Sequence, residues 1–175
     1  MSGLIYNQRD IPREKWRYGL RSSAATGCGW IACYNALRLM DDPADPEELI
    51  RYFEHQVPLL HGNAGTLALA PVFYFRSRGF RVEKTSVREK FDALAAGSDV
   101  CLMFYYWRRK LTFGAHFVAL RYRDGRFVGY NTFRNSVGPD DYGPSLEAFL
   151  KKQGFFGPVL IGIRKTAESA PTTHA

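Results

Sequence analysis

The sequence is poor in the residue patterns that build disulfide frameworks and metal sites. Its 175 residues include three cysteines, Cys28, Cys33 and Cys101, and this odd number without paired spacing argues against a disulfide framework. It contains no Cys-x-x-Cys pair, no His-Glu-x-x-His motif and no acidic calcium-binding loop. We therefore expect no disulfide, no metal and no other cofactor.

Long apolar runs are also missing. Every apolar run is far shorter than the roughly 18 residues that suggest a membrane-spanning helix. Residues 1–10 lack the basic segment and the apolar stretch of a secretory signal peptide. The sequence accordingly predicts a protein without a membrane span that resides in the reducing cytoplasm.

Apolar residues are abundant, and positive charge is in moderate excess. Hydrophobic residues make up 46% of the chain and aromatic residues 15%, which is typical of a globular domain with a full core. The net charge of +7 suits an acidic substrate or partner. Because no nucleic-acid recognition motif accompanies this charge, we expect no nucleic-acid binding.

The pattern of apolar residues predicts helices first and antiparallel strands afterwards. Helices are expected over about 29–40, 46–55, 66–77, 86–97 and 144–153. Strands are expected over about 80–84, 100–107, 116–122, 126–131 and 158–164. A capping-box pattern of Ser86 and Glu89 marks the start of the helix over 86–97. This order predicts an α+β fold, with one domain over residues 1–165 and a disordered tail over 166–175.

The stretch Gly27-Cys28-Gly29 runs directly into the first apolar helix. A helix N-terminus carries unpaired N–H groups and partial positive charge, which favour the nucleophilic thiolate form of cysteine. We interpret the flanking glycines as leaving room for a substrate backbone beside the sulfur. Cys33 and Cys101 fall inside a buried helix and a buried strand, so we interpret both as packing residues.

A hairpin late in the sequence offers partners for such a nucleophile. Thiol acyl transfer needs a histidine as base and a further residue that orients the imidazole. A two-residue turn at Asp124-Gly125 would place Asn131 opposite Val118 and therefore diagonal to His116. The sequence thus offers Cys28, His116 and Asn131 as a triad.

Each of these residues also has an ordinary structural explanation. A cysteine near a helix start is most often a core residue, and a histidine on a strand usually serves packing or hydrogen bonding. The remaining histidines are weaker candidates, because they are expected in a helix, a loop and the tail: His55, His61 and His174. The coincidence of three suitable residues in the order Cys, His, Asn favours an enzyme.

Four stretches carry a resemblance to a known family: Tyr6-Asn7-Gln8-Arg9-Asp10, Ala24-Ala25-Thr26-Gly27-Cys28-Gly29, Gly114-Ala115-His116-Phe117-Val118-Ala119-Leu120 and Tyr130-Asn131. Together they resemble papain-like cysteine peptidases, specifically stand-alone bacterial relatives of the bacteriocin-leader-processing (double-glycine) peptidases. The resemblance spans about residues 5–164. It implies that Cys28 is the nucleophile, His116 the general base and acid, and Asn131 the orienting residue. It also implies that Gln8 donates to the oxyanion hole together with the backbone N–H of Cys28.

The function implied by this resemblance is cleavage of a peptide or isopeptide-like amide bond through an acyl-enzyme. The substrate would be a peptide or protein, and the basic stretch 108–110, expected as a loop, would rim the cleft and favour acidic substrate residues; a solvated turn is the alternative for that stretch. Two further functions stay open. One is an amidase, deamidase or acyltransferase with the same triad, and the other is a catalytically inactive papain-like binding module. The sequence leaves the oligomeric state open.

Overall fold

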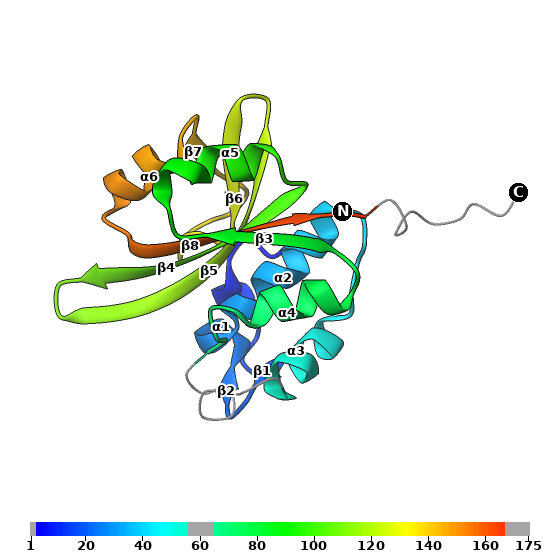
Figure 1. The fold of residues 1–175 in the computed structure, drawn as a ribbon. Helices are drawn as coiled ribbons and strands as arrows, with labels where there is room; N and C mark the ends of the chain where they lie inside the picture. Colours follow the sequence, from blue (N-terminus) through cyan, green and yellow to red (C-terminus); the bar gives the residue numbers. More distant parts are fainter. Residues whose placement is uncertain (1–2, 56–64, 167–175) are drawn as a thin grey trace, which may run out of the picture.

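The computed structural model describes residues 3–55 and 65–166, which form a six-stranded sheet with helices on both faces (Figure 1). The helices are α1 (Ser23–Thr26), α2 (Cys28–Leu39), α3 (Pro46–His55), α4 (Ala70–Ser77), α5 (Phe91–Ala96) and α6 (Leu146–Gln153), with single 3-10 turns η1 (Gln8–Asp10) and η2 (Arg88–Lys90). The strands are β1 (Arg17–Tyr18), β2 (Arg21–Ser22), β3 (Arg81–Thr85), β4 (Val100–Arg109), β5 (Thr112–Arg123), β6 (Arg126–Tyr130), β7 (Asp140–Gly143) and β8 (Phe156–Arg164). The predicted α+β class is confirmed.

The six strands lie in the order β3-β8-β4-β5-β6-β7, and all neighbours are antiparallel. Strands β4 to β7 form a meander, whereas β8 returns from the end of the chain and inserts between β3 and β4. Of the predicted strands, those corresponding to β4, β5 and β6 are neighbours in chain order, whereas the strand corresponding to β8 is not next to β6. Strand β4 lies inside the sheet, and its continuous apolar run follows from burial on both faces.

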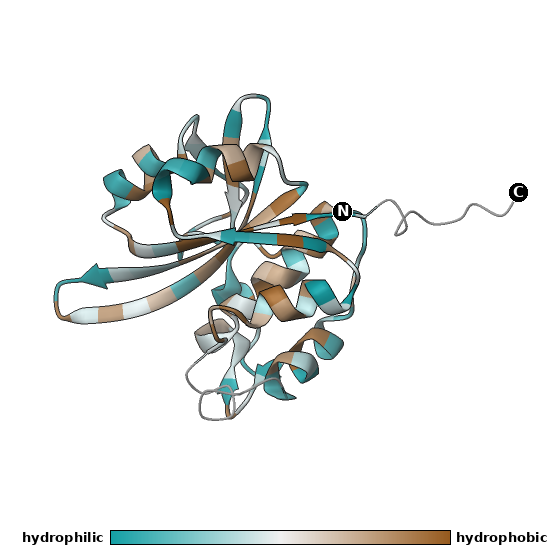
Figure 2. Cartoon of the chain, in the orientation of Figure 1, coloured by the Kyte–Doolittle hydropathy of each residue, from teal (hydrophilic) through white to brown (hydrophobic). Residues whose placement is uncertain are grey.

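Two hydrophobic clusters occupy the two faces of the sheet. Leu102 and Phe104 of β4 join the cluster that contains α2, α3 and α4. Met103 and Tyr105 join the cluster that contains α5 and α6. This alternation is the two-residue period of a strand. Helix α2 is buried continuously from residue 29 to 37, as its apolar sequence predicts, and Figure 2 shows the apolar colouring of this helix and of the central strands.

The hairpin between β5 and β6 has the predicted turn and register. Asp124 and Gly125 both have positive φ, at 51° and 78°, as a tight two-residue turn between twisted strands requires. Arg123 pairs with Arg126, and the pairing continues to Ala119 and Tyr130. The residues of this turn therefore determine the β5–β6 register, on which the relative positions of His116 and Asn131 depend.

Several element boundaries differ from the sequence prediction. Helix α4 begins at Ala70 rather than residue 66, with Pro71 in its first turn, where the missing N–H of proline is tolerated. Ser86 does not cap a helix, because Val87 occupies the cap position of η2 and donates its N–H to the Thr85 hydroxyl. Of residues 108–110, Arg108 and Arg109 belong to β4, and Arg109 pairs with Thr112 of β5, while only Lys110 lies in the turn.

Further elements were not predicted. The lead-in segment contains η1, β1, β2 and α1, and β7 lies in the stretch 134–143, for which no strand was expected. The predicted tail lies outside the described residues from position 167 onward, as do His61 and His174. In the part of the chain that the structure describes, no helix combines the length and apolarity needed to cross a membrane.

Candidate active site

Cys28 is the first residue of α2, and its half-buried side chain lies against β5. The backbone N–H groups of Phe117, Gly29 and Cys28 lie near enough to the sulfur to lower the pKa of the thiol in part. Strand β6 pairs with β5 only from Ala119 to Arg123, so Phe117 lies where β6 no longer covers the edge. The sulfur is therefore positioned at the open edge of β5, next to the residue that follows His116.

The glycines beside Cys28 serve internal packing. Gly27 and Gly29 are both buried. A Cβ atom added to Gly29 would collide with the Thr66 side chain, and one added to Gly27 would lie 2.6 Å from the Ser23 carbonyl oxygen and from Trp30 Nε1. The interpretation that these glycines leave room for a substrate backbone is wrong, because the protein itself fills that space.

His116 lies on β5 opposite Tyr105 of β4, and the two rings meet edge to face with centroids 5.9 Å apart. Its Nε2 atom is 2.6 Å from the backbone carbonyl oxygen of Asn131. A carbonyl oxygen only accepts hydrogen bonds, so Nε2 carries the hydrogen in the neutral ring. Nδ1 then holds the free lone pair and is the basic nitrogen.

His116 and Cys28 approach the open edge of β5 from opposite faces of the sheet. His116 shares the face of Tyr105, which packs in the cluster with α5 and α6. Cys28 packs in the cluster with α2, on the face of Phe117. The two side chains thus lie on different faces of the sheet at neighbouring positions of β5, and within the described residues no hydrogen bond joins the thiol to the imidazole.

Asn131 follows β6 and has the left-handed conformation, with φ at 63°. Asparagine tolerates this region better than most residues with a side chain. Its side-chain amide does not bond to His116. Instead, Oδ1 accepts from the backbone N–H of Gln8 at 2.8 Å, and Nδ2 donates to Gln8 Oε1 at 3.1 Å. The expectation that this side chain reaches the imidazole is corrected: the backbone carbonyl makes that contact, while the side chain holds Gln8.

Gln8 connects Asn131 to the helical layer. Its Nε2 atom donates to the carbonyl oxygen of Ala24 in α1, at 3.1 Å. A continuous series of hydrogen bonds thus runs from Ala24 through Gln8 and Asn131 to the imidazole of His116. The resemblance had implied an oxyanion-hole role for Gln8, and the observed contacts add a structural role as the link between the two layers.

Burial controls the protonation of the two reactive groups. Burial raises the pKa of the Cys28 thiol above its usual value, although the N–H donors of Phe117 and Gly29 lower it in part. Burial lowers the pKa of the His116 imidazole, and the Asn131 carbonyl partly offsets that effect. At neutral pH the pair therefore rests as a neutral thiol and a neutral imidazole. The predicted preference for a thiolate at the helix N-terminus is outweighed by burial.

The other cysteines and the remaining described histidine lie away from this site. Cys33 and Cys101 are core residues, as predicted, and burial raises the pKa of Cys101 to about 12. His55 is the last residue of α3 and its Nδ1 atom lies 2.7 Å from the Arg51 carbonyl oxygen. Among residues 3–55 and 65–166, no group of three histidine, cysteine or acidic side chains is placed to hold a metal ion.

Two supporting residues were missed from the sequence. Thr66 packs on Gly29, and its hydroxyl lies 3.0 Å from the hydroxyl of the buried Tyr18. Tyr105 supports the imidazole of His116 from the neighbouring strand. A tight turn after Arg109 would have predicted that Tyr105 pairs with His116. The sequence analysis did not predict this turn, because it interpreted residues 108–110 as a loop.

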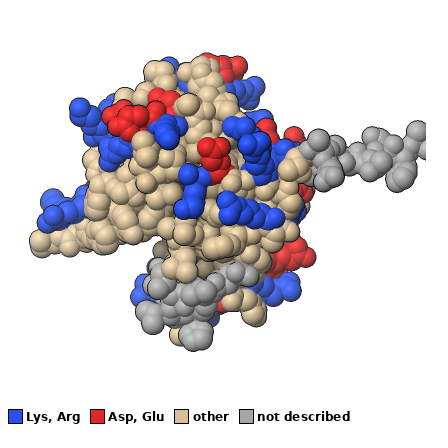
Figure 3. All heavy atoms as spheres, in the orientation of Figure 1, with Lys and Arg blue, Asp and Glu red and all other residues tan. Residues whose placement is uncertain are grey.

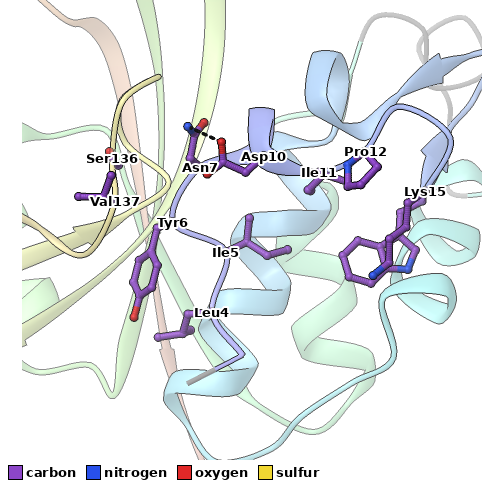
Figure 4. A pocket seen from close by; sticks show the side chains of 11 residues that line it. Leu4, Ile5, Tyr6, Asn7, Asp10, Ile11, Pro12, Lys15, Ser136 and Val137 are labelled. Carbon is purple, nitrogen blue, oxygen red and sulfur yellow. Dashed lines mark hydrogen bonds between the residues drawn. The ribbon is translucent and has the colours of Figure 1, made fainter. Parts of the chain in front are cut away.

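A pocket of about 310 Å³ lies beside this network, between the N-terminal segment and the loop at Ser136 (Figure 4). Asn7, which caps η1, and Asp10, its last residue, line the pocket and are joined by a hydrogen bond of 3.1 Å. Neither Cys28 nor His116 lines this pocket. It therefore adjoins the Gln8 side of the network rather than the thiol.

A cysteine at a helix N-terminus, packed on an antiparallel sheet whose open edge carries a histidine, agrees with the papain-like fold that the resemblance implied. A comparison with solved structures agrees. The chain superposes on the peptidase domain of Streptococcus ComA, a bi-functional ABC transporter involved in a quorum-sensing pathway, with a TM-score of 0.54 and 14% identity. The match covers 81% of this chain and 93% of that domain, and at this identity it establishes the fold. No protein-family model and no curated protein sequence matches the chain.

Proposed function

We propose that this protein is a cysteine peptidase in which Cys28 is the nucleophile and His116 the general base and acid. The observation that carries the proposal is the 2.6 Å contact between His116 Nε2 and the Asn131 carbonyl oxygen. It leaves Nδ1 as the nitrogen that can accept the thiol proton. Asn131 positions the imidazole through its backbone, and Gln8 holds Asn131.

The reaction begins with two neutral groups. Nδ1 of His116 takes the thiol proton as the Cys28 sulfur attacks the carbonyl carbon of the substrate amide. The backbone N–H of Cys28 and the second amide hydrogen of Gln8 stabilise the oxyanion of the tetrahedral intermediate. The imidazolium then protonates the amine as the C–N bond breaks, leaving a thioester. Water attacks the thioester, His116 takes its proton and returns it to the sulfur, and the acid product leaves.

The proposed substrate is a peptide or protein. The basic residues Arg108 to Lys110 lie at the end of the β4–β5 hairpin, about four strand residues or roughly 13 Å from His116. The expected preference for acidic substrates would therefore act about four residues away from the scissile bond. The described cysteines are all unpaired, which supports the proposed location in the reducing cytoplasm.

Peptide-library cleavage by the wild type and by Cys28→Ala tests the proposal, with new termini read by mass spectrometry. Cleavage that Cys28→Ala abolishes supports a peptidase. Release of ammonia without chain cleavage would instead assign the triad to amidase or deamidase chemistry. A thiol-reactive probe gives a second measurement, because Cys28 should label faster than the buried Cys33 and Cys101. Equal labelling would favour the inactive binding module.

A further inference from the structure

The end of the β4–β5 hairpin carries an exposed apolar group that the proposed catalytic site does not use. The two strands project beyond the helical layers (Figure 1). At the turn, Leu111 is fully exposed, and Phe113 behind it is 64% exposed. Exposure of apolar side chains to water is unfavourable. Their position at the end of a projecting hairpin therefore indicates a surface that contacts a partner.

Stacked aromatic rings make the base of this projection rigid. Tyr106 stacks on Phe113 at 5.5 Å and on Phe156 of β8 at 5.8 Å. Strand pairing continues to the last pair, Arg109 and Thr112. The exposed leucine is thus presented on a paired, stacked support.

All the charged side chains at this hairpin end are basic. Between Asp99 and Asp124 the sequence has no acidic residue, and Arg108, Arg109 and Lys110 come directly before Leu111. Within the described parts of the chain, none of these three cations forms a salt bridge. The space-filling view shows this projection with Lys and Arg and without Asp or Glu on the visible face (Figure 3).

We propose that the hairpin end defined by residues 108–113 docks on an anionic lipid surface. A narrow convex end offers far less area than the roughly 800 Å² per partner of a stable protein interface. A lipid headgroup layer needs no matching shape: it accepts a few apolar side chains and attracts the basic residues around them. Leu111 and Phe113 would enter the layer, while Arg108, Arg109 and Lys110 contact the lipid phosphates.

Vesicle co-sedimentation tests this docking with the full chain. The two vesicle types are phosphatidylcholine alone and phosphatidylcholine with phosphatidylglycerol. We expect the wild type to partition at least about tenfold more strongly onto the anionic vesicles, with binding reduced by added salt. Leu111→Ser should reduce this partition about tenfold or more, whereas Val137→Ser, which changes an equally exposed apolar residue on another loop, should leave it unchanged.

Two double variants with the same change in charge test the role of the basic residues. Arg109→Gln/Lys110→Gln should weaken binding to anionic vesicles, whereas Lys151→Gln/Lys152→Gln, with the same charge change on the exposed face of α6, should have a much smaller effect. Equal binding to both vesicle types, or unchanged binding by Leu111→Ser, would overturn the proposal. So would tight, salt-sensitive binding of a DNA duplex through Arg109 and Lys110 without vesicle binding. Leu111→Ser and Lys151→Gln/Lys152→Gln change residues outside the proposed catalytic and substrate-binding groups, so hydrolysis of a soluble peptide should persist in both.

Discussion

The backbone carbonyl of Asn131 accepts a hydrogen bond from His116 Nε2 at 2.6 Å, while the side chain of Asn131 bonds to Gln8. The residue that follows β6 thus serves the imidazole with its main chain rather than with its side chain. The identity of the residue matters for two other reasons: it must tolerate a φ of 63°, and it must hold Gln8.

Substitution of Asn131 separates these roles. Asn131→Gly keeps the carbonyl oxygen and adopts positive φ without strain, so kcat should stay within about tenfold of the wild type. Asn131→Ala loses the same side-chain bonds and in addition disfavours the left-handed conformation by about 1 kcal/mol or more. It should therefore lower kcat further, toward the roughly hundredfold loss that misplacement of a catalytic group can cause. Steady-state kinetics on the two variants provides the comparison, and equal losses would instead indicate that the side chain orients His116.

Substitution of Gln8 tests the link between the layers. Gln8→Ala removes the bond to Ala24 and leaves Asn131 Nδ2 without its partner. If Gln8 acted only by holding Asn131, its loss would add little to Asn131→Gly. If it also stabilises the oxyanion, as we propose, kcat should fall by about 100-fold or more in either background. A double-mutant cycle with both variants measures this difference. A kcat unchanged by Gln8→Ala would contradict the oxyanion role.

Local chemistry explains which parts of this arrangement the sequence predicted. The turn at Asp124-Gly125 sets the register of β5 and β6 from two adjacent residues, and it brings Asn131 near His116. The contact between Asn131 and Gln8 was not predictable, because the two residues are 123 positions apart in sequence and meet only in the folded chain. The insertion of β8 between β3 and β4 was likewise not predictable, because it depends on pairing between strands that are distant in sequence.

The close packing at Gly29 predicts a stability effect without any change in charge. In Gly29→Ala the new methyl group collides with the Thr66 side chain, which is held by the hydroxyl of Tyr18. We expect a loss of about 1–3 kcal/mol in the free energy of unfolding, as is usual for overpacked sites. Gly138→Ala is the matched control, because a Cβ at that position meets no atom within 4 Å. Urea denaturation of both variants measures the difference, and equal stability would contradict the packing role of Gly29.

The protonation of the resting pair predicts a particular pH dependence. Since burial lowers the pKa of His116, the neutral imidazole that the mechanism needs is lost only as the pH falls below the usual histidine value of about 6.5. Since burial raises the pKa of Cys28, its alkylation by iodoacetamide should continue to rise at alkaline pH, above the range in which an ordinary thiol titrates. A preformed thiolate–imidazolium pair would instead give fast alkylation that is already constant near neutral pH. Rates measured from pH 5 to 10, by labelling and by peptide cleavage, distinguish the two states. Cys28→Ala serves as the control for labelling at the other cysteines.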